Sequence, residues 1–175
     1  MRRMVFSALY IAFGLVIPMI FHAVGMGGPV FLPMHIPVLL GGLTLGPSAG
    51  LTVGLMTPLL SAMLTGMPPL GSPIVFFMMA ELAAYGLIAG LLMKRRVNLL
   101  VSLGAALVGG RIALGLAVAA GRLLADFPGA PVAYVAGAVV TGLPGLAIQV
   151  VVVPLLAAAL LKTPAGMVTQ REAQP

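Results

Sequence analysis

The sequence has no cysteine and no tryptophan, and only 7% of its 175 residues are charged. Without cysteine the chain can form no disulfide, thiolate metal site or thiol nucleophile. Its three acidic residues and two histidines are too few for a multi-carboxylate proton relay or an intramembrane metalloprotease site. With 61% hydrophobic residues, too little charge remains to cover a water-soluble domain. An integral membrane protein is therefore predicted.

Sequence motifs for common chemistries are also missing. There is no G-x-x-x-x-G-K-[ST], so the chain itself is not expected to hydrolyse ATP. The zinc protease motif H-E-x-x-H and the hydrolase elbow G-x-S-x-G are absent. The formal charge of +6 comes from basic residues at the ends of apolar runs, which membrane topology explains better than nucleic acid. No enzyme activity, cofactor, metal ion or nucleic acid partner is therefore expected.

Apolar runs separated by glycine- and proline-rich breaks predict six membrane-spanning helices, because a hydrocarbon core of about 30 Å needs roughly 20 apolar residues per helix. The spans are expected at residues 4–22, 34–46, 49–65, 73–93, 97–124 and 132–161. They form an all-α six-helix bundle. One membrane domain over residues 1–165 is predicted, followed by a short cytoplasmic tail at 166–175.

The basic residues predict the orientation of the bundle. They gather in three groups at span ends: Arg2 with Arg3, then Lys94, Arg95 and Arg96, and finally Lys162 with Arg171. In a six-span arrangement all three groups lie on one side of the membrane. The positive-inside rule makes that side cytoplasmic, so both termini are predicted to be cytoplasmic.

Small residues recur at the spacing of one helix face. The pairs are Gly42 with Gly46, Gly50 with Gly54, Gly86 with Gly90, and Gly115 with Ala119. In lipid such pairs let helix backbones approach closely, and a tightly packed monomeric bundle is favoured over an oligomer seam. Pro58, Pro144 and Pro154 lie inside predicted spans, where a missing N–H is expected to kink the helix.

Two ionisable side chains are predicted to lie at one depth inside the membrane, where such groups are rare and mark function. Glu81 is eight residues into the fourth span from its outer end, about 12 Å deep. Arg111 is about 21 Å above the inner start of the fifth span, hence roughly 9 Å below the outer face. They could form a buried ion pair between two helices, or two walls of an outward-facing pocket. A planar guanidinium suits a ligand carboxylate.

Other polar residues are weaker candidates. His35 begins the second span after Pro33, so its ring either lies wetted at the outer interface or hydrogen-bonds a ligand, with Phe31 as a stacking surface. Met67, in an outside loop, could form an adaptable wall, although methionines in apolar chains usually serve packing. Gln149 and Asn98 are expected nearer the cytoplasmic side, as helix-contact or interface residues.

The segment "PMHIPVLLGGLTLGPSAGLTVGLMTPLLSAMLTGMPPLGSP", followed by "ELAAYGLIAGLL", resembles the substrate-binding S components of energy-coupling factor (ECF) transporters, which are prokaryotic vitamin importers. The resemblance covers nearly the whole chain and includes an A-x-x-x-A pattern at Ala8 and Ala12. In that family this motif packs against a transmembrane T component, and two ATPase subunits drive transport. The resemblance implies a multi-pass, non-enzymatic, vitamin-binding subunit in the prokaryotic plasma membrane.

Binding pockets of that family lie near the outer face. The resemblance therefore implies a ligand site formed by Phe31, His35, Met67, Glu81 and Arg111. Arg111 fits a carboxylate such as pantothenate, whereas Glu81 and His35 suit pyridoxine or hydroxymethylpyrimidine. Two alternatives remain open: a membrane enzyme or assembly factor that uses Glu81 and Arg111 on a lipid-linked substrate, and a scaffold without a ligand.

Overall fold

The computed structural model describes residues 2–25 and 27–163, and over these ranges the chain forms helices and no strand. The helices are α1 (Arg2–Ala23), α2 (Gly28–Phe31), α3 (His35–Leu45), α4 (Pro47–Thr65), α5 (Ile74–Lys94), α6 (Leu99–Ala125), α7 (Pro131–Thr141) and α8 (Leu143–Leu161). Six segments are long and apolar enough to cross a membrane: α1, α2 with α3, α4, α5, α6 and α8. The all-α, six-span prediction is confirmed, while the predicted tail at 166–175, with Arg171, lies outside the described residues.

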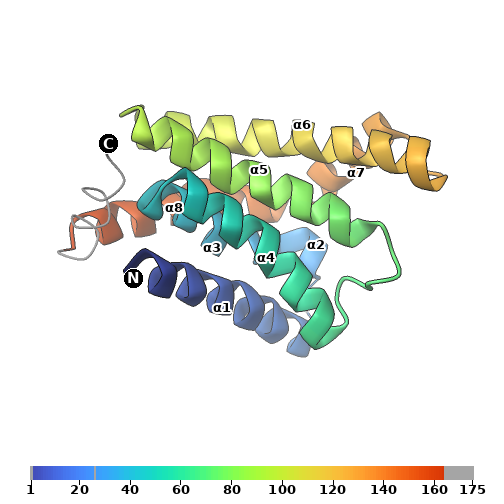
Figure 1. Cartoon of the computed structure of the whole chain (residues 1–175), viewed down its shortest axis with the longest axis horizontal. Helices are drawn as coiled ribbons and strands as arrows, with labels where there is room; N and C mark the ends of the chain where they lie inside the picture. The colour runs from blue at the N-terminus through green and yellow to red at the C-terminus, as the bar shows by residue number, and fades with distance from the viewer. Residues whose placement is uncertain (1, 26, 164–175) are drawn as a thin grey trace.

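The helices run roughly along one direction, so the bundle has two ends (Figure 1). The start of α1, the α5–α6 connection and the finish of α8 lie at one end, called here the basic end because it carries Arg2, Lys94 and Lys162. The α4–α5 and α6–α7 connections lie at the opposite end, called the far end. The three basic groups described in the structure therefore share an end, as six spans require.

The short helix α3 is the centre of the bundle. It contacts α1, α4, α5, α6 and α8, and all its residues except Ile36 are buried. Val38, Leu39 and Leu43 belong to the main core together with Leu82 and Tyr85 of α5. A polar residue on α3 is consequently surrounded by other helices rather than by lipid.

Glycines allow α3, α4 and α5 to pack backbone against backbone. A Cβ added to Gly50 would overlap the carbonyl of Gly86 and lie 2.7 Å from the Cα of Gly42. A Cβ on Gly90 would lie 2.6 Å from the carbonyl carbon of Gly46. The close approach predicted for these glycine pairs is confirmed. Gly115 differs, since its added Cβ would be in ordinary contact with the chain around it.

The span over 132–161 was expected to be one helix kinked at Pro144, but the chain breaks completely at Gly142 into α7 and α8. Pro144 has no N–H to donate to the carbonyl of Val140, and its ring would clash with that carbonyl in an unbroken helix. The amide of Gly142 still donates to Ala138 O (3.0 Å), and Leu146 donates to Gly142 O (2.8 Å). Helices α4 and α8, by contrast, continue through their internal prolines, Pro58 and Pro154.

Candidate functional site

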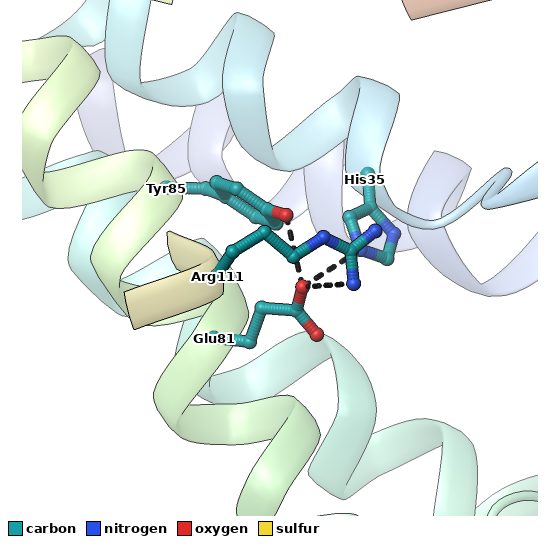
Figure 2. A network of polar contacts seen from close by, with 4 residues as sticks. All are labelled: His35, Glu81, Tyr85 and Arg111. Carbon is teal, nitrogen blue, oxygen red and sulfur yellow. Dashed lines mark hydrogen bonds and ion pairs between the residues drawn. The ribbon is translucent and has the colours of Figure 1, made fainter. Parts of the chain in front are cut away.

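Four side chains from three helices meet inside the bundle: His35 of α3, Glu81 and Tyr85 of α5, and Arg111 of α6 (Figure 2). We call them the polar cluster. Its centre is Glu81 Oε1, which accepts a hydrogen bond from Tyr85 OH at 2.9 Å and lies 2.7 Å from Arg111 Nη1. The ring of His35 approaches the same oxygen, with Nε2 at 4.0 Å. All these side chains converge on one carboxylate.

The turn before α3 places His35 in the cluster. Leu32 ends α2 in the left-handed conformation (φ 49°, ψ 45°), and Leu32, Pro33 and Met34 are all buried. His35 then starts α3 with 4% of its surface exposed. The expectation of a ring wetted at the interface is therefore wrong, because the turn directs the first residue of α3 into the core.

Glu81 and Tyr85 are one helical turn apart on α5, so their side chains lie on the same face. The Tyr85 ring is packed 5.2 Å from the His35 ring, centroid to centroid. The same ring also contacts Gly110, where an added Cβ would overlap it. Tyr85 was missed from the sequence, although a hydroxyl four residues after a membrane-embedded carboxylate is a usable signal.

The predicted equal depth of Glu81 and Arg111 is confirmed by their contact. The side chains are 6% and 11% exposed, so the ion pair lies within the bundle. Gly142 lies beside the guanidinium: a Cβ added there would be 3.5 Å from Arg111 Nη2 and 2.9 Å from Leu32 Cδ1. The carboxyl end of α7 thus lies near the cation, where a helix dipole stabilises positive charge.

Several buried atoms of the polar cluster have no hydrogen-bond partner among the described residues. They are Nε and Nη2 of Arg111 and both ring nitrogens of His35. Because Glu81 occupies Nη1 alone, the parallel N–H groups of Nε and Nη2 form an unused two-donor edge. Such an edge matches the two oxygens of a carboxylate.

Phe31 and Met67 lie outside the polar cluster, judged by the contacts of the described residues. The Phe31 ring packs against Phe21 with centroids 5.6 Å apart. Met67 is 53% exposed in the α4–α5 connection, and its carbonyl accepts a hydrogen bond from Ser61 Oγ at 2.7 Å. Of the five residues expected at the ligand, the structure brings together His35, Glu81 and Arg111.

An aromatic cluster of Phe77, Phe127 and Tyr134 lies beyond Glu81 toward the far end. Phe77 is one turn before Glu81 on α5, and its ring meets those of Phe127 and Tyr134 edge-on at 5.1 and 6.0 Å. These rings join α5 to α7 and to the loop before α7.

The described residues contain no group of three or more histidine or acidic side chains that could hold a metal ion. No curated protein and no solved structure matches the chain significantly. A family model does match, over residues 2–157, and its description is ECF transporter, substrate-specific component. This match covers most of the chain, including α1 to α7 and the residues of the polar cluster. The chain therefore belongs to the family of substrate-specific components of ECF transporters.

Proposed function

We propose that this protein captures a small, carboxylate-bearing vitamin or vitamin precursor at the polar cluster and delivers it inward as part of an ECF importer. The observation that carries the proposal is the unpaired Nε–Nη2 edge of the buried Arg111. Buried donors are satisfied in nearly all folded proteins, so an intact donor pair in a core points to a ligand.

The charges of the polar cluster support an acidic ligand. Glu81 neutralises Arg111 through a single nitrogen, and a second carboxylate can share the guanidinium through the other two. The His35 ring, whose Nε2 is 4.0 Å from Glu81 Oε1, adds two unpaired ring nitrogens to the same site. Bidentate Arg–carboxylate pairing gives both strength and orientation.

This chemistry favours a pantothenate-like ligand over the other candidates. Pyridoxine and hydroxymethylpyrimidine carry hydroxyls and ring nitrogens but no carboxylate. They could bond to Glu81 and His35, yet they would leave the two-donor edge of Arg111 unsatisfied, at an unfavourable energy of about 1–3 kcal/mol per buried group. Membership of a transporter family also favours capture of a soluble ligand over chemistry on a lipid-linked substrate.

The T component is proposed to bind α1 at Ala8 and Ala12. Both residues are exposed and lie four apart on one face, so a partner helix could approach the α1 backbone closely there. Two ATPase subunits would supply the energy. The location proposed is the plasma membrane of a prokaryote, with the basic end in the cytoplasm.

The test is the thermal unfolding of the detergent-purified protein with pantothenate, pyridoxine or hydroxymethylpyrimidine. Ligand at about 100 times its Kd should stabilise the folded state by about 2.7 kcal/mol, which raises Tm. We expect the shift with pantothenate, its loss in Arg111→Gln, and its retention in Arg122→Gln, a control at an exposed arginine of the same helix. An equal pantothenate shift in Arg111→Gln, or no shift with any of the three compounds, would contradict the proposal.

A further inference from the structure

Gln149 of α8 is a buried polar residue outside the polar cluster as defined above. Its exposure is 0%, and neither Oε1 nor Nε2 has a hydrogen-bond partner within the described part of the chain. A primary amide offers two N–H donors and a carbonyl acceptor, all normally satisfied when buried. The Gln149 amide is therefore buried and unpaired, as is the Nε–Nη2 edge of Arg111.

Counting along α8 places Gln149 near the polar cluster, on its basic-end side. Gly142, whose added Cβ would be 3.5 Å from Arg111 Nη2, directly precedes α8, and Gln149 follows it by seven residues. At about 1.5 Å per residue, the Gln149 backbone is therefore about 10 Å further along α8 than Gly142. An extended small ligand bound at Arg111 can cover that distance.

The packing of α8 directs Gln149 toward the cluster. The buried residues of α8 are Gly145, Gln149, Val153 and Ala157, four apart on the face that packs on α3 and α6. These two helices carry His35 and Arg111. A helical side chain leans toward the helix N-terminus, so the amide of Gln149 is directed toward the start of α8. Gly142, the residue just before the start of α8, lies beside Arg111 Nη2.

We propose that Gln149 is a further ligand-binding residue of this site and that the ligand carries an amide in addition to its carboxylate. The inference rests on the proposed function and narrows its ligand class. The carboxylate would bind the Nε–Nη2 edge of Arg111. The ligand amide would donate its N–H to Gln149 Oε1 and accept from Nε2 at its carbonyl oxygen. The donor and acceptor of the His35 ring suit a ligand hydroxyl.

The test measures pantothenate affinity by titration calorimetry in wild type, Gln149→Leu and Gln149→Met. Pantothenate has a carboxylate, an amide and hydroxyls, and pantoate serves as a second probe with the carboxylate but no amide. Removing the Gln149 amide should weaken pantothenate binding about tenfold or more, since the ligand amide loses its partners. Pantoate binding should fall by a smaller factor. The ligand-free Tm of either variant should stay unchanged or rise, because an unpaired buried amide is removed.

The control is Ser102→Ala, which removes a fully buried polar group of α6, close to the basic end, and should leave pantothenate affinity unchanged. Unchanged affinity in Gln149→Leu or Gln149→Met, with normal binding by wild type, overturns this inference alone. A lower ligand-free Tm in these variants without loss of pantothenate affinity also overturns the inference. That result is expected if the Gln149 amide has a structural role or is paired with buried water. Wild-type binding of pyridoxine but not pantothenate overturns the amide-carboxylate class. Absence of binding to every probe instead counts against the proposed function.

Discussion

The ion pair between Glu81 and Arg111 predicts strong energetic coupling between these two residues. The perturbation is a double-mutant cycle of Glu81→Gln, Arg111→Met and the double variant in the ligand-free protein. Each single change leaves one buried charge without its partner. The double change replaces the pair with an uncharged amide and an apolar side chain of comparable length.

The magnitude follows from the geometry of the pair. Glu81 Oε1 and Arg111 Nη1 are 2.7 Å apart, and the side chains are 6% and 11% exposed, so little solvent screens the charge left behind. Breaking such a pair by removing one partner costs about 3–5 kcal/mol. In each single variant the remaining buried charge keeps one hydrogen-bond partner. In Arg111→Met the Tyr85 hydroxyl still donates to Glu81, and in Glu81→Gln the new amide oxygen still accepts from Arg111. We therefore expect about 3 kcal/mol for each single variant.

The double variant should lose about as much stability as either single variant, which corresponds to an interaction energy of about 3 kcal/mol. Reversible unfolding in mixed detergent micelles measures all four proteins. Free energy losses that add in the double variant would refute the coupling. A pantothenate shift that survives in any variant lacking Arg111 would refute the ligand role of the pair.

Three further outcomes are expected. Tyr85→Phe removes a hydrogen bond to a buried carboxylate and should lower the free energy of unfolding by about 1.5–3 kcal/mol, measured by denaturant unfolding. Gly50→Ala should lower it by about 3 kcal/mol or more, or prevent recovery of monodisperse protein on gel filtration, because the new Cβ would overlap the neighbouring backbone carbonyl. Ala8→Leu with Ala12→Leu should block copurification with a T component while leaving pantothenate affinity unchanged, because both positions are exposed on α1.

Each of these predictions has a contrasting control or outcome. Gly104→Ala places a Cβ in open space and should stabilise its helix by about 0.5–1 kcal/mol, so equal damage at both glycines would contradict the packing argument. Met19→Leu changes another exposed residue of α1 and should leave copurification intact. Unaltered stability in Tyr85→Phe would mean that the tyrosine hydroxyl does not hold the carboxylate.

Apolar length and glycine spacing were sufficient to predict most of the fold. Each span from the first to the fifth has a counterpart in a helix or helix pair of the structure, and the glycines of α3 to α5 pack as their spacing predicts. The missing N–H of Pro144 predicted a kink in the helix over 132–161, but the continuous hydropathy of this run did not show that the helix would end at Gly142 and restart. The letters "GLPG" at 142–145 carried the signal, since glycine and proline together mark breaks.

The site was partly predictable because depth can be counted along a helix but side-chain direction cannot. Counting residues along the predicted spans correctly placed Glu81 and Arg111 at the same depth. It could not show that Leu32 turns His35 into the core. Gln149 was expected nearer the cytoplasmic side as a helix-contact residue. Counting could not show that its amide is fully buried and has no hydrogen-bond partner among the described residues.

The most direct test of the central claim is native mass spectrometry of the detergent-purified wild type and Arg111→Ala, after incubation with pantothenate. Wild type is predicted to retain one pantothenate and release it on denaturation, while the variant retains none. The ligand-free masses of both proteins serve as the reference. A wild type that carries and gains no small molecule, or an Arg111→Ala protein that retains pantothenate as well as wild type does, would contradict the account of the polar cluster as a carboxylate-binding site.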